Sequence, residues 1–188
     1  MDRNRTGVMV EAGLTIALAY VLGRFMIYAL PNGGAVSLEM LPILVFAYRR
    51  GLAAGVFAGA IYGLLNYTIH PVGVVHWIQF ALDYSVAYGL LGLAGIGAGR
   101  PGRSDASDRT VLRMRAALTP VLLLAMSARF AAHLVSGIVF FGAYAPPGQP
   151  VFLYSLIYNS TYMIPAMILC MIAAYLVMPT LQKAVPVR

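Results

Sequence analysis

Long apolar runs constrain this chain more than any other feature. The 188 residues are 61% hydrophobic and 10% charged, whereas soluble domains are about 45–50% apolar and about 25% charged. A helix that crosses a bilayer needs about 20 apolar residues, so the chain has room for about six crossings and little else. We therefore predict an all-α integral membrane protein with a single domain over residues 1–188. Its six transmembrane helices are expected at about 8–30, 37–48, 52–69, 74–99, 116–143 and 151–177.

Turn-forming residues separate these runs. Pro31-Asn32-Gly33-Gly34 ends the first run, Arg49-Arg50-Gly51 ends the second, and residues 145–150 lie between the last two. Proline and glycine at such positions end helices and form turns. Residues 100–115 are the only strongly polar stretch, and we expect them to form a loop.

When the chain is divided into these six helices, the basic residues outside the apolar runs all lie on one side of the membrane. Lys and Arg occur near both termini, at 49–50 and between 100 and 115, whereas the loops at 31–37, 70–73 and 144–150 contain none. Cytoplasmic loops of membrane proteins carry an excess of Lys and Arg. Both termini are therefore expected in the cytoplasm. The net charge of +7 then reflects topology, and nucleic acid is not an expected partner.

Ionisable residues inside the expected helices are candidate functional residues, because a charge near the bilayer centre costs at least ~2.5–3.5 kcal/mol. They are Glu11, Arg24, Glu39, Asp83, Arg129 and His133. Helical spacing gathers some of them with other polar and aromatic side chains on three faces. These faces are Arg129, His133, Gly137 and Phe141; Gln79 and Asp83; and Tyr154, Tyr158 and Tyr162 with Asn159 adjacent.

Together these faces predict a polar, aromatic cavity that opens to the outside. Acidic residues facing it, Asp83 and Glu39, favour a cationic ligand, and aromatic rings favour a flat or delocalised positive charge. Structural roles are open for the same residues. Asp83 and Arg129 can form an ion pair, His133 can serve as an interhelical hydrogen-bonding residue, tyrosines concentrate at membrane interfaces, and Glu11 and Arg24 can reach the surface from the ends of their helix.

Motifs of enzymes and cofactor sites are absent from the sequence. There is no HExxH, no GxSxG and no P-loop with its Lys and Ser/Thr, so active transport would need ions or partner subunits. The one cysteine, Cys170, and three scattered histidines offer no metal-site spacing. We expect a binding and translocation protein that is not an enzyme, with no metal and no cofactor.

Five runs in the chain resemble the thiamine-specific S component of energy-coupling-factor (ECF) transporters. Their order and spacing hold from about Val10 to Val177. The runs are Gly33–Pro42, Phe46–Leu52, Gln79–Tyr84, Arg129–Gly137 with Phe140–Pro146, and Tyr154–Asn159.

The resemblance implies a six-helix subunit in the plasma membrane of a prokaryote, which captures thiamine outside. It implies partnership with a transmembrane T component and two cytoplasmic ATPases, in addition to membrane lipid. It also implies that eight residues line the thiamine pocket. They are Glu39, Asp83, Tyr84, His133, Gly137, Phe141, Tyr154 and Asn159.

Small residues in the first expected helix are candidates for docking to the T component. Gly13 and Ala17 lie four residues apart, and small residues let two helices approach closely within lipid. Packing inside the six-helix domain is the other interpretation, although Gly55, Gly59 and Gly63 fit that internal role better. Two other functions stay open: an S component for another aromatic or cationic vitamin, and a stand-alone ion-coupled solute carrier.

Overall fold

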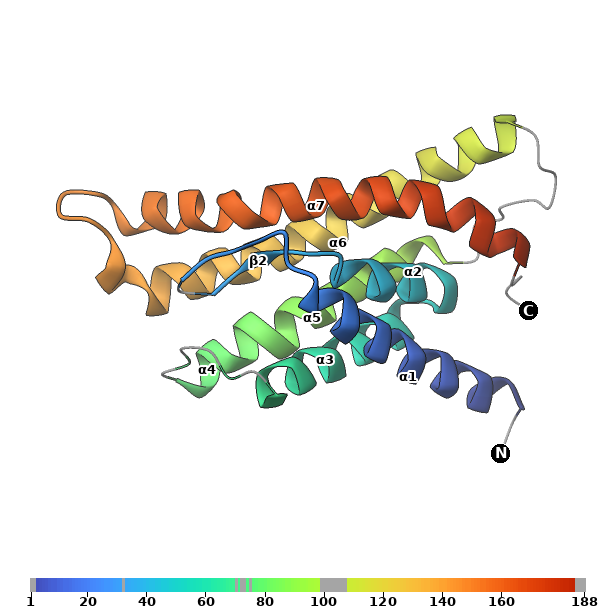
Figure 1. Cartoon of the computed structure of the whole chain (residues 1–188), viewed down its shortest axis with the longest axis horizontal. Helices are drawn as coiled ribbons and strands as arrows, with labels where there is room; N and C mark the ends of the chain where they lie inside the picture. Colours follow the sequence, from blue (N-terminus) through green and yellow to red (C-terminus); the bar gives the residue numbers. More distant parts are fainter. Residues whose placement is uncertain are drawn as a thin grey trace.

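A computed structural model describes residues 3–31, 33–69, 71, 74, 76–98 and 108–184. In this part of the chain, six helical rods and one short hairpin form a single bundle (Figure 1). The fourth rod, residues 77–97, is continuous but changes its helix type three times. The elements are α1 (Arg3–Arg24), β1 (Tyr28–Ala29), β2 (Ala35–Val36), α2 (Met40–Arg50), α3 (Leu52–Ile69), α4 (Trp77–Phe80), η1 (Ala81–Val86), α5 (Ala87–Gly89), η2 (Leu90–Gly97), α6 (Asp108–Phe140), η3 (Gly142–Tyr144) and α7 (Val151–Ala184).

Five of the six rods are long and apolar enough to cross a membrane, and the predicted all-α fold class is confirmed. The exception is α2, whose 11 residues span only about 16 Å at a rise of about 1.5 Å per residue. Most α2 side chains are buried, among them Met40, Ile43 and Leu44. α2 is therefore a central helix enclosed by its neighbours.

The first helix ends at Arg24, so the expected boundary near Leu30 is wrong. Residues 28–31 and 33–36 instead form the two sides of an antiparallel hairpin, in which Tyr28 pairs with Val36 and Ala29 with Ala35. Gly33 and Gly34 have φ values of 92° and 93°, which side chains with a Cβ rarely adopt. An apolar run as short as residues 25–30 fits a strand as well as a helix, and here the hairpin prevails.

Other boundaries also differ from those expected. The structure places 108–115 in α6 rather than in the expected 100–115 loop, of which residues 100–107 lie outside the described residues. The second helix begins at 40 instead of 37, and α7 continues to 184 instead of 177. The fourth rod, expected at 74–99, covers 77–97, and residues 75 and 99 lie outside the described residues. A helix that extends beyond the apolar core can use polar residues, which a hydropathy pattern does not register.

Glycines bring α3 against the fourth rod, as predicted for Gly55, Gly59 and Gly63. A Cβ at Gly55 would lie 2.9 Å from the Cα atom of Gly92, and one at Gly59 would lie 2.7 Å from the carbonyl carbon of Tyr88. Real Cβ atoms essentially never show contacts under 3.0 Å. The two rods therefore pack backbone to backbone, and only glycine fits at these contacts.

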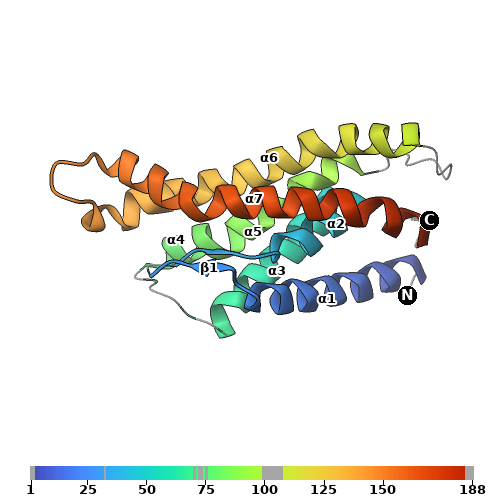
Figure 2. The same ribbon diagram turned by 45° about the horizontal axis from the view of Figure 1, so that its top comes forward.

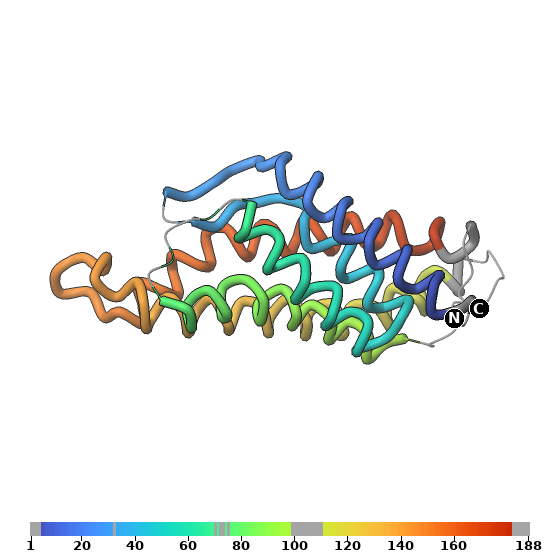
Figure 3. Tube along the Cα trace, turned by 90° about the horizontal axis from the view of Figure 1, so that it is seen from below, coloured from blue at the N-terminus to red at the C-terminus, as the bar shows by residue number. Residues whose placement is uncertain are grey.

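The rods alternate in direction, so the start of α1 and the end of α7 lie at the same end of the bundle (Figures 1 and 3). The start of α6 lies at that end too, and α6 and α7 run antiparallel along nearly the whole length (Figure 2). Arg49 and Arg50 close α2, and Glu11 of α1 binds both of them, with its carboxylate 3.1 Å from Arg49 Nε and 2.6 Å from Arg50 Nε.

Candidate functional site

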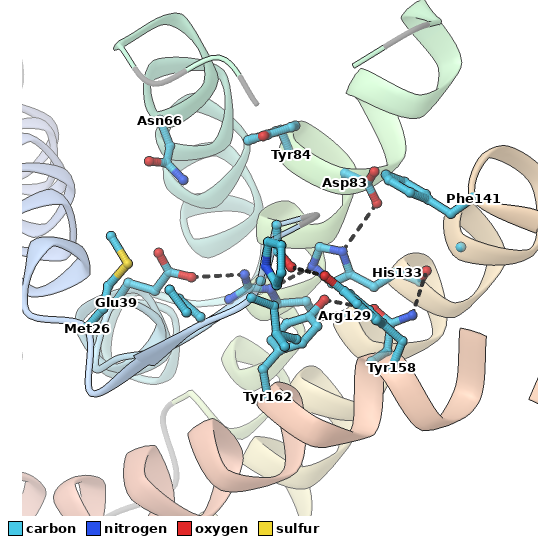
Figure 4. Close-up of a pocket in the computed structure, with 18 of the residues that line it drawn as sticks. Met26, Glu39, Asn66, Asp83, Tyr84, Arg129, His133, Phe141, Tyr158 and Tyr162 are labelled. Atoms are coloured by element: carbon cyan, nitrogen blue, oxygen red, sulfur yellow. Dashed lines mark hydrogen bonds and ion pairs between the residues drawn. The ribbon is translucent and has the colours of Figure 1, made fainter. Parts of the chain in front are cut away.

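A cavity of about 380 Å³ lies between the hairpin, η1, α6 and α7 (Figure 4). It occupies the half of the bundle away from the start of α1, because Asn66 near the end of α3 and Phe141 just after α6 both line it. The volume is within the usual range of about 300–1,000 Å³ for small-molecule sites. Polar and aromatic side chains in or next to the helices form most of the wall. They are Glu39, Asn66, Gln79, Asp83, Tyr84, Tyr88, Arg129, His133, Phe141, Tyr154, Ser155, Tyr158, Asn159 and Tyr162.

Glu39, directly before α2, accepts hydrogen bonds from three side chains. Its Oε1 is 3.0 Å from Arg129 Nη2 and 2.6 Å from the Tyr88 hydroxyl, and its Oε2 is 3.0 Å from the Tyr62 hydroxyl. The Arg129 guanidinium also lies 3.9 Å from the centre of the Tyr88 ring. Buried charges need this kind of mutual compensation. The charge of Glu39 is therefore balanced by the protein itself.

Asp83 interacts with His133 rather than with Arg129. Its Oδ1 is 3.3 Å from His133 Nδ1, while Arg129 Nε lies 3.3 Å from His133 Nε2 (Figure 4). The interpretation of Asp83 and Arg129 as an ion pair is therefore wrong, because Glu39 holds the guanidinium. His133 of α6 thus makes an interhelical hydrogen bond, as one interpretation expected, while its role toward a ligand stays a prediction. Asp83 is the carboxylate of the cavity that no arginine or lysine neutralises among the described residues.

A π-helical segment presents Asp83 and Tyr84 to the cavity. Both lie in η1, and π-helical turns occur often at functional sites because they redirect side chains. Gly63 of α3 packs against this segment, since a Cβ at Gly63 would lie 2.5 Å from the carbonyl carbon of Tyr84. The ring of Tyr84 lies 5.0 Å from that of Tyr67 and 6.0 Å from that of Phe80, centre to centre.

Gly137 allows α6 and α7 to approach beside the cavity. A Cβ there would overlap the hydroxyl of Ser155 and lie 3.1 Å from Asn159 Nδ2. Asn159 Nδ2 donates to the Ser155 carbonyl at 2.9 Å, and its Oδ1 accepts from the Tyr162 hydroxyl at 2.8 Å. Asn159 is thus positioned by its own helix, with its amide already bonded to neighbours.

The hairpin covers the cavity and contacts α7. The Tyr158 hydroxyl donates to the carbonyl of Gly33 at 3.0 Å, and a Cβ at Gly34 would lie 2.6 Å from the Tyr162 ring. Met26, Pro31 and Ala35 are further lining residues from this segment. The hairpin therefore separates the cavity from the surroundings on one side.

All eight residues expected to line a pocket do line this one cavity: Glu39, Asp83, Tyr84, His133, Gly137, Phe141, Tyr154 and Asn159. Figure 4 shows Phe141 next to Asp83 and Tyr84 closer to α3. Sequence reasoning missed Tyr62, Tyr88 and the hairpin residues. Nothing in the sequence links Tyr88 to Glu39, which is 49 positions away, whereas the Pro31–Gly34 turn motif was a signal for the hairpin.

Gly13 and Ala17 of α1 face away from the bundle. A Cβ at Gly13 would meet nothing within 4 Å, and Ala17 is exposed. Their neighbours Val10, Leu14 and Leu18 are 58%, 68% and 51% exposed. In contrast, Ala19 is fully buried, and a Cβ at Gly23 would lie 3.2 Å from Glu39 Oε2. Small residues therefore occur on two sides of α1, with Gly13 and Ala17 on the exposed side and Ala19 and Gly23 against the rest of the bundle.

Comparison with known proteins identifies relatives over nearly the whole chain. The profile of a family described as thiamine transporter protein (Thia_YuaJ) matches residues 9–186. Thiamine transporter ThiT of Bacillus subtilis (strain 168) is 36% identical over 176 residues, which cover 92% of this chain and 90% of that protein. Thiamine transporter ThiT of Lacticaseibacillus paracasei is 31% identical over 159 residues, covering 81% and 77%.

A solved structure has the same fold. ThiT from Listeria monocytogenes superposes with a TM-score of 0.84 at 25% sequence identity, covering 95% of this chain and 97% of that one.

Proposed function

The chain belongs to the thiamine transporter family, and from this membership and the cavity we propose that it captures thiamine outside the cell and delivers it inward as the S component of an ECF transporter. As a member of this family with several apolar helices, it is a multi-pass protein of the plasma membrane. It is a transport protein and not an enzyme. The absence of its own ATPase site, based on the missing P-loop motif, is part of the proposal.

The observation that carries the proposal is the pairing of charges in the cavity. Glu39 is balanced by Arg129, whereas the ion pair that Asp83 makes among the described residues is with His133. A ligand with one permanent positive charge, such as thiamine with its thiazolium ring, would neutralise the negative charge of Asp83. The attraction between the two charges would offset part of the free energy that the ligand loses on leaving water.

Aromatic residues that line the same cavity support the same ligand. Phe141, Tyr84 and Tyr154 line the cavity, and ring faces stabilise both flat heterocycles and delocalised cations. The aminopyrimidine of thiamine has donors and acceptors that hydroxyl and carboxylate groups can match. We assign the substrate-binding role to these residues together with Glu39, Asp83, His133, Gly137 and Asn159.

Calorimetry on the detergent-purified protein tests this function. Thiamine should bind saturably without any ion or nucleotide, and riboflavin, biotin and pyridoxal should not compete. Tighter binding of another of these vitamins would reassign the substrate within the same architecture. If thiamine bound only in the presence of a coupling ion, the protein would be a stand-alone carrier, and folded protein that binds none of the four would contradict the proposal.

We further propose that the six rods form six membrane passages, α2 being the short central one, with both termini in the cytoplasm. Basic residues near the chain ends and at the end of α2 support this orientation. Thr6 and Tyr144 are exposed near opposite ends of the bundle and are suitable labelling positions. In a Cys170→Ser background, an impermeant thiol reagent outside intact cells should label Tyr144→Cys and not Thr6→Cys. The reverse pattern would contradict the orientation.

The partners of this subunit are proposed to be a T component and two ATPases, with docking through Gly13 and Ala17. Their exposure on an apolar face of α1 supports close approach by another helix. Gly13→Trp or Ala17→Trp should leave thiamine binding by the isolated subunit unchanged and abolish ATP-driven uptake by the assembled transporter. Ile168→Trp on α7, at a position that is 56% exposed, is the matched control and should leave both activities intact. Uptake that survives the α1 variants would move the docking surface elsewhere.

A further inference from the structure

Four side chains form a continuous hydrogen-bonded series across the cavity. Arg129 Nη2 donates to Glu39 Oε1 at 3.0 Å, Arg129 Nε donates to His133 Nε2 at 3.3 Å, and His133 Nδ1 lies 3.3 Å from Asp83 Oδ1. These residues come from the position directly before α2, from α6 and from η1. The series therefore joins the two carboxylates of the site through one guanidinium and one imidazole (Figure 4).

The direction of these bonds determines where the proton of His133 lies. A guanidinium nitrogen only donates hydrogen bonds, so His133 Nε2 must be the acceptor in its bond with Arg129. A neutral imidazole carries its one proton on the other nitrogen, so His133 Nδ1–H donates to Asp83. Adding a second proton at Nε2 would bring two donors and two positive charges together at this point.

Charged and titratable groups surround His133 on several sides. Asp83 of η1 and Arg129 of α6 contact its two nitrogens, and Glu39 lies beyond Arg129. Tyr162 of α7 lies 6.2 Å away from ring centre to ring centre, and Tyr88 of α5 lies under the guanidinium. With His133 neutral, Glu39 and Arg129 cancel, and Asp83 supplies the one net negative charge of this group.

We propose that Arg129 is a positioning residue for ligand binding, which keeps His133 neutral with its proton on Nδ1 so that Asp83 retains its negative charge. This inference rests on the proposed function, in which Asp83 faces the thiazolium. Without the guanidinium, a proton could occupy Nε2 in mild acid. The resulting His133 cation would neutralise Asp83 and repel a positively charged ligand.

The consequence is a thiamine affinity that does not change with pH in the range where histidine normally titrates, around pH 6 to 8. Removing Arg129 alone would leave Glu39 as a buried, unpaired carboxylate, which is strongly destabilising. The Glu39→Gln/Arg129→Met double variant removes both charges together. The side-chain amide that Glu39→Gln introduces retains hydrogen-bonding capacity for the hydroxyls of Tyr62 and Tyr88.

Calorimetry at about pH 8 and about pH 6 tests this role in the full-length, detergent-purified protein. The wild-type dissociation constant for thiamine should change less than about twofold. In the double variant it should be at least about fivefold larger at pH 6 than at pH 8, because proton binding to His133 and ligand binding now compete. Adding His133→Asn should remove this pH dependence. A double variant as flat as the wild type would overturn the inference.

A second measurement uses the wild-type protein and therefore does not depend on variant folding. Nitrogen-15 NMR of labelled histidine side chains, with His133→Asn for assignment, should show an Nδ1–H, neutral His133 at both pH values. An Nε2–H tautomer, or protonation of both nitrogens at pH 6, would refute the role of Arg129. A wild-type protein that binds no thiamine would instead contradict the proposed function, while the NMR result would still decide the state of His133.

Discussion

Replacing Gly63 by alanine is the sharpest test of how the bundle positions the site. The new Cβ would lie 2.5 Å from the carbonyl carbon of Tyr84, whereas Cβ contacts under 3.0 Å essentially do not occur. α3 and η1 must therefore separate by at least 0.5 Å, the difference between these two distances. Because Asp83 and Tyr84 both lie in η1, the displacement moves the carboxylate and an aromatic ring together.

The cost to binding can be worked out from this displacement. For unit charges about 4 Å apart at an effective dielectric constant of about 20, the attraction is about 4 kcal/mol, and lengthening the distance by about 0.5 Å removes about 0.5 kcal/mol of it. Loss of one well-aligned hydrogen bond adds about 1 kcal/mol. The total of about 1.5 kcal/mol predicts roughly tenfold weaker thiamine binding.

Gly89→Ala is the matched control, because it lies on the fourth rod and a Cβ there would meet its nearest neighbour, the Val56 carbonyl oxygen, at an ordinary 3.6 Å. Both variants gain the helix propensity of alanine, about 0.5–1 kcal/mol. Calorimetry with thiamine, together with thermal unfolding, should give about tenfold weaker binding for Gly63→Ala and a change under about threefold for Gly89→Ala. Unchanged affinity in a folded Gly63→Ala protein would refute the claim that this contact sets the position of Asp83.

Three further predictions concern single side chains. Asp83→Asn should weaken thiamine binding by about tenfold or more, and Asp83→Glu by less, because a charge-assisted interaction is worth about 1.5–3 kcal/mol. Equal losses of affinity in calorimetry would show that the shape of the side chain matters more than its charge. Tyr158→Phe removes the hydrogen bond between the hairpin and α7 and should speed thiamine release about fivefold in stopped-flow measurements. Tyr144→Phe, at an exposed position, is the control and should not change the release rate. Equal release rates for the two variants would contradict a role of this hydrogen bond in retaining the ligand. Glu11→Gln removes the negative charge that faces the Arg49 side chain, which is 3% exposed. The variant should have a melting temperature several degrees lower and an unchanged thiamine affinity. An unchanged melting temperature would mean that other contacts hold this arginine.

Much of the site could be predicted because helical spacing is a local property. Arg129, His133 and Gly137 recur every four residues, so a helix alone places them on one face. An ionisable residue in an apolar run is also conspicuous, because membrane burial is costly without a function or a partner. The cavity lining contains all three predicted faces, while their role in binding thiamine stays a prediction.

The choice of ionic partners could not be predicted in the same way. Glu39 and Arg129 are 90 positions apart and Asp83 and His133 are 50 apart, and the sequence suggested Asp83 rather than Glu39 as the ionic partner of Arg129. The π-helical turn that redirects Asp83 leaves no hydropathy signal. The hairpin was missed because residues 25–30 are apolar enough to extend the first helix.

By itself the sequence determined that the chain lies in a membrane, that its fold is helical and which orientation to expect. Lipid requires the polar groups of each backbone segment to be satisfied within that segment, so long apolar runs indicate helices, and basic loops indicate the orientation. Only the tertiary structure decided which helices approach closely, which charge pairs with which, and that β1 and β2 form a hairpin over the cavity. Those outcomes depend on distances between segments remote in sequence. A shift of half an ångström or one residue of register changes them without altering the hydrophobic pattern at all.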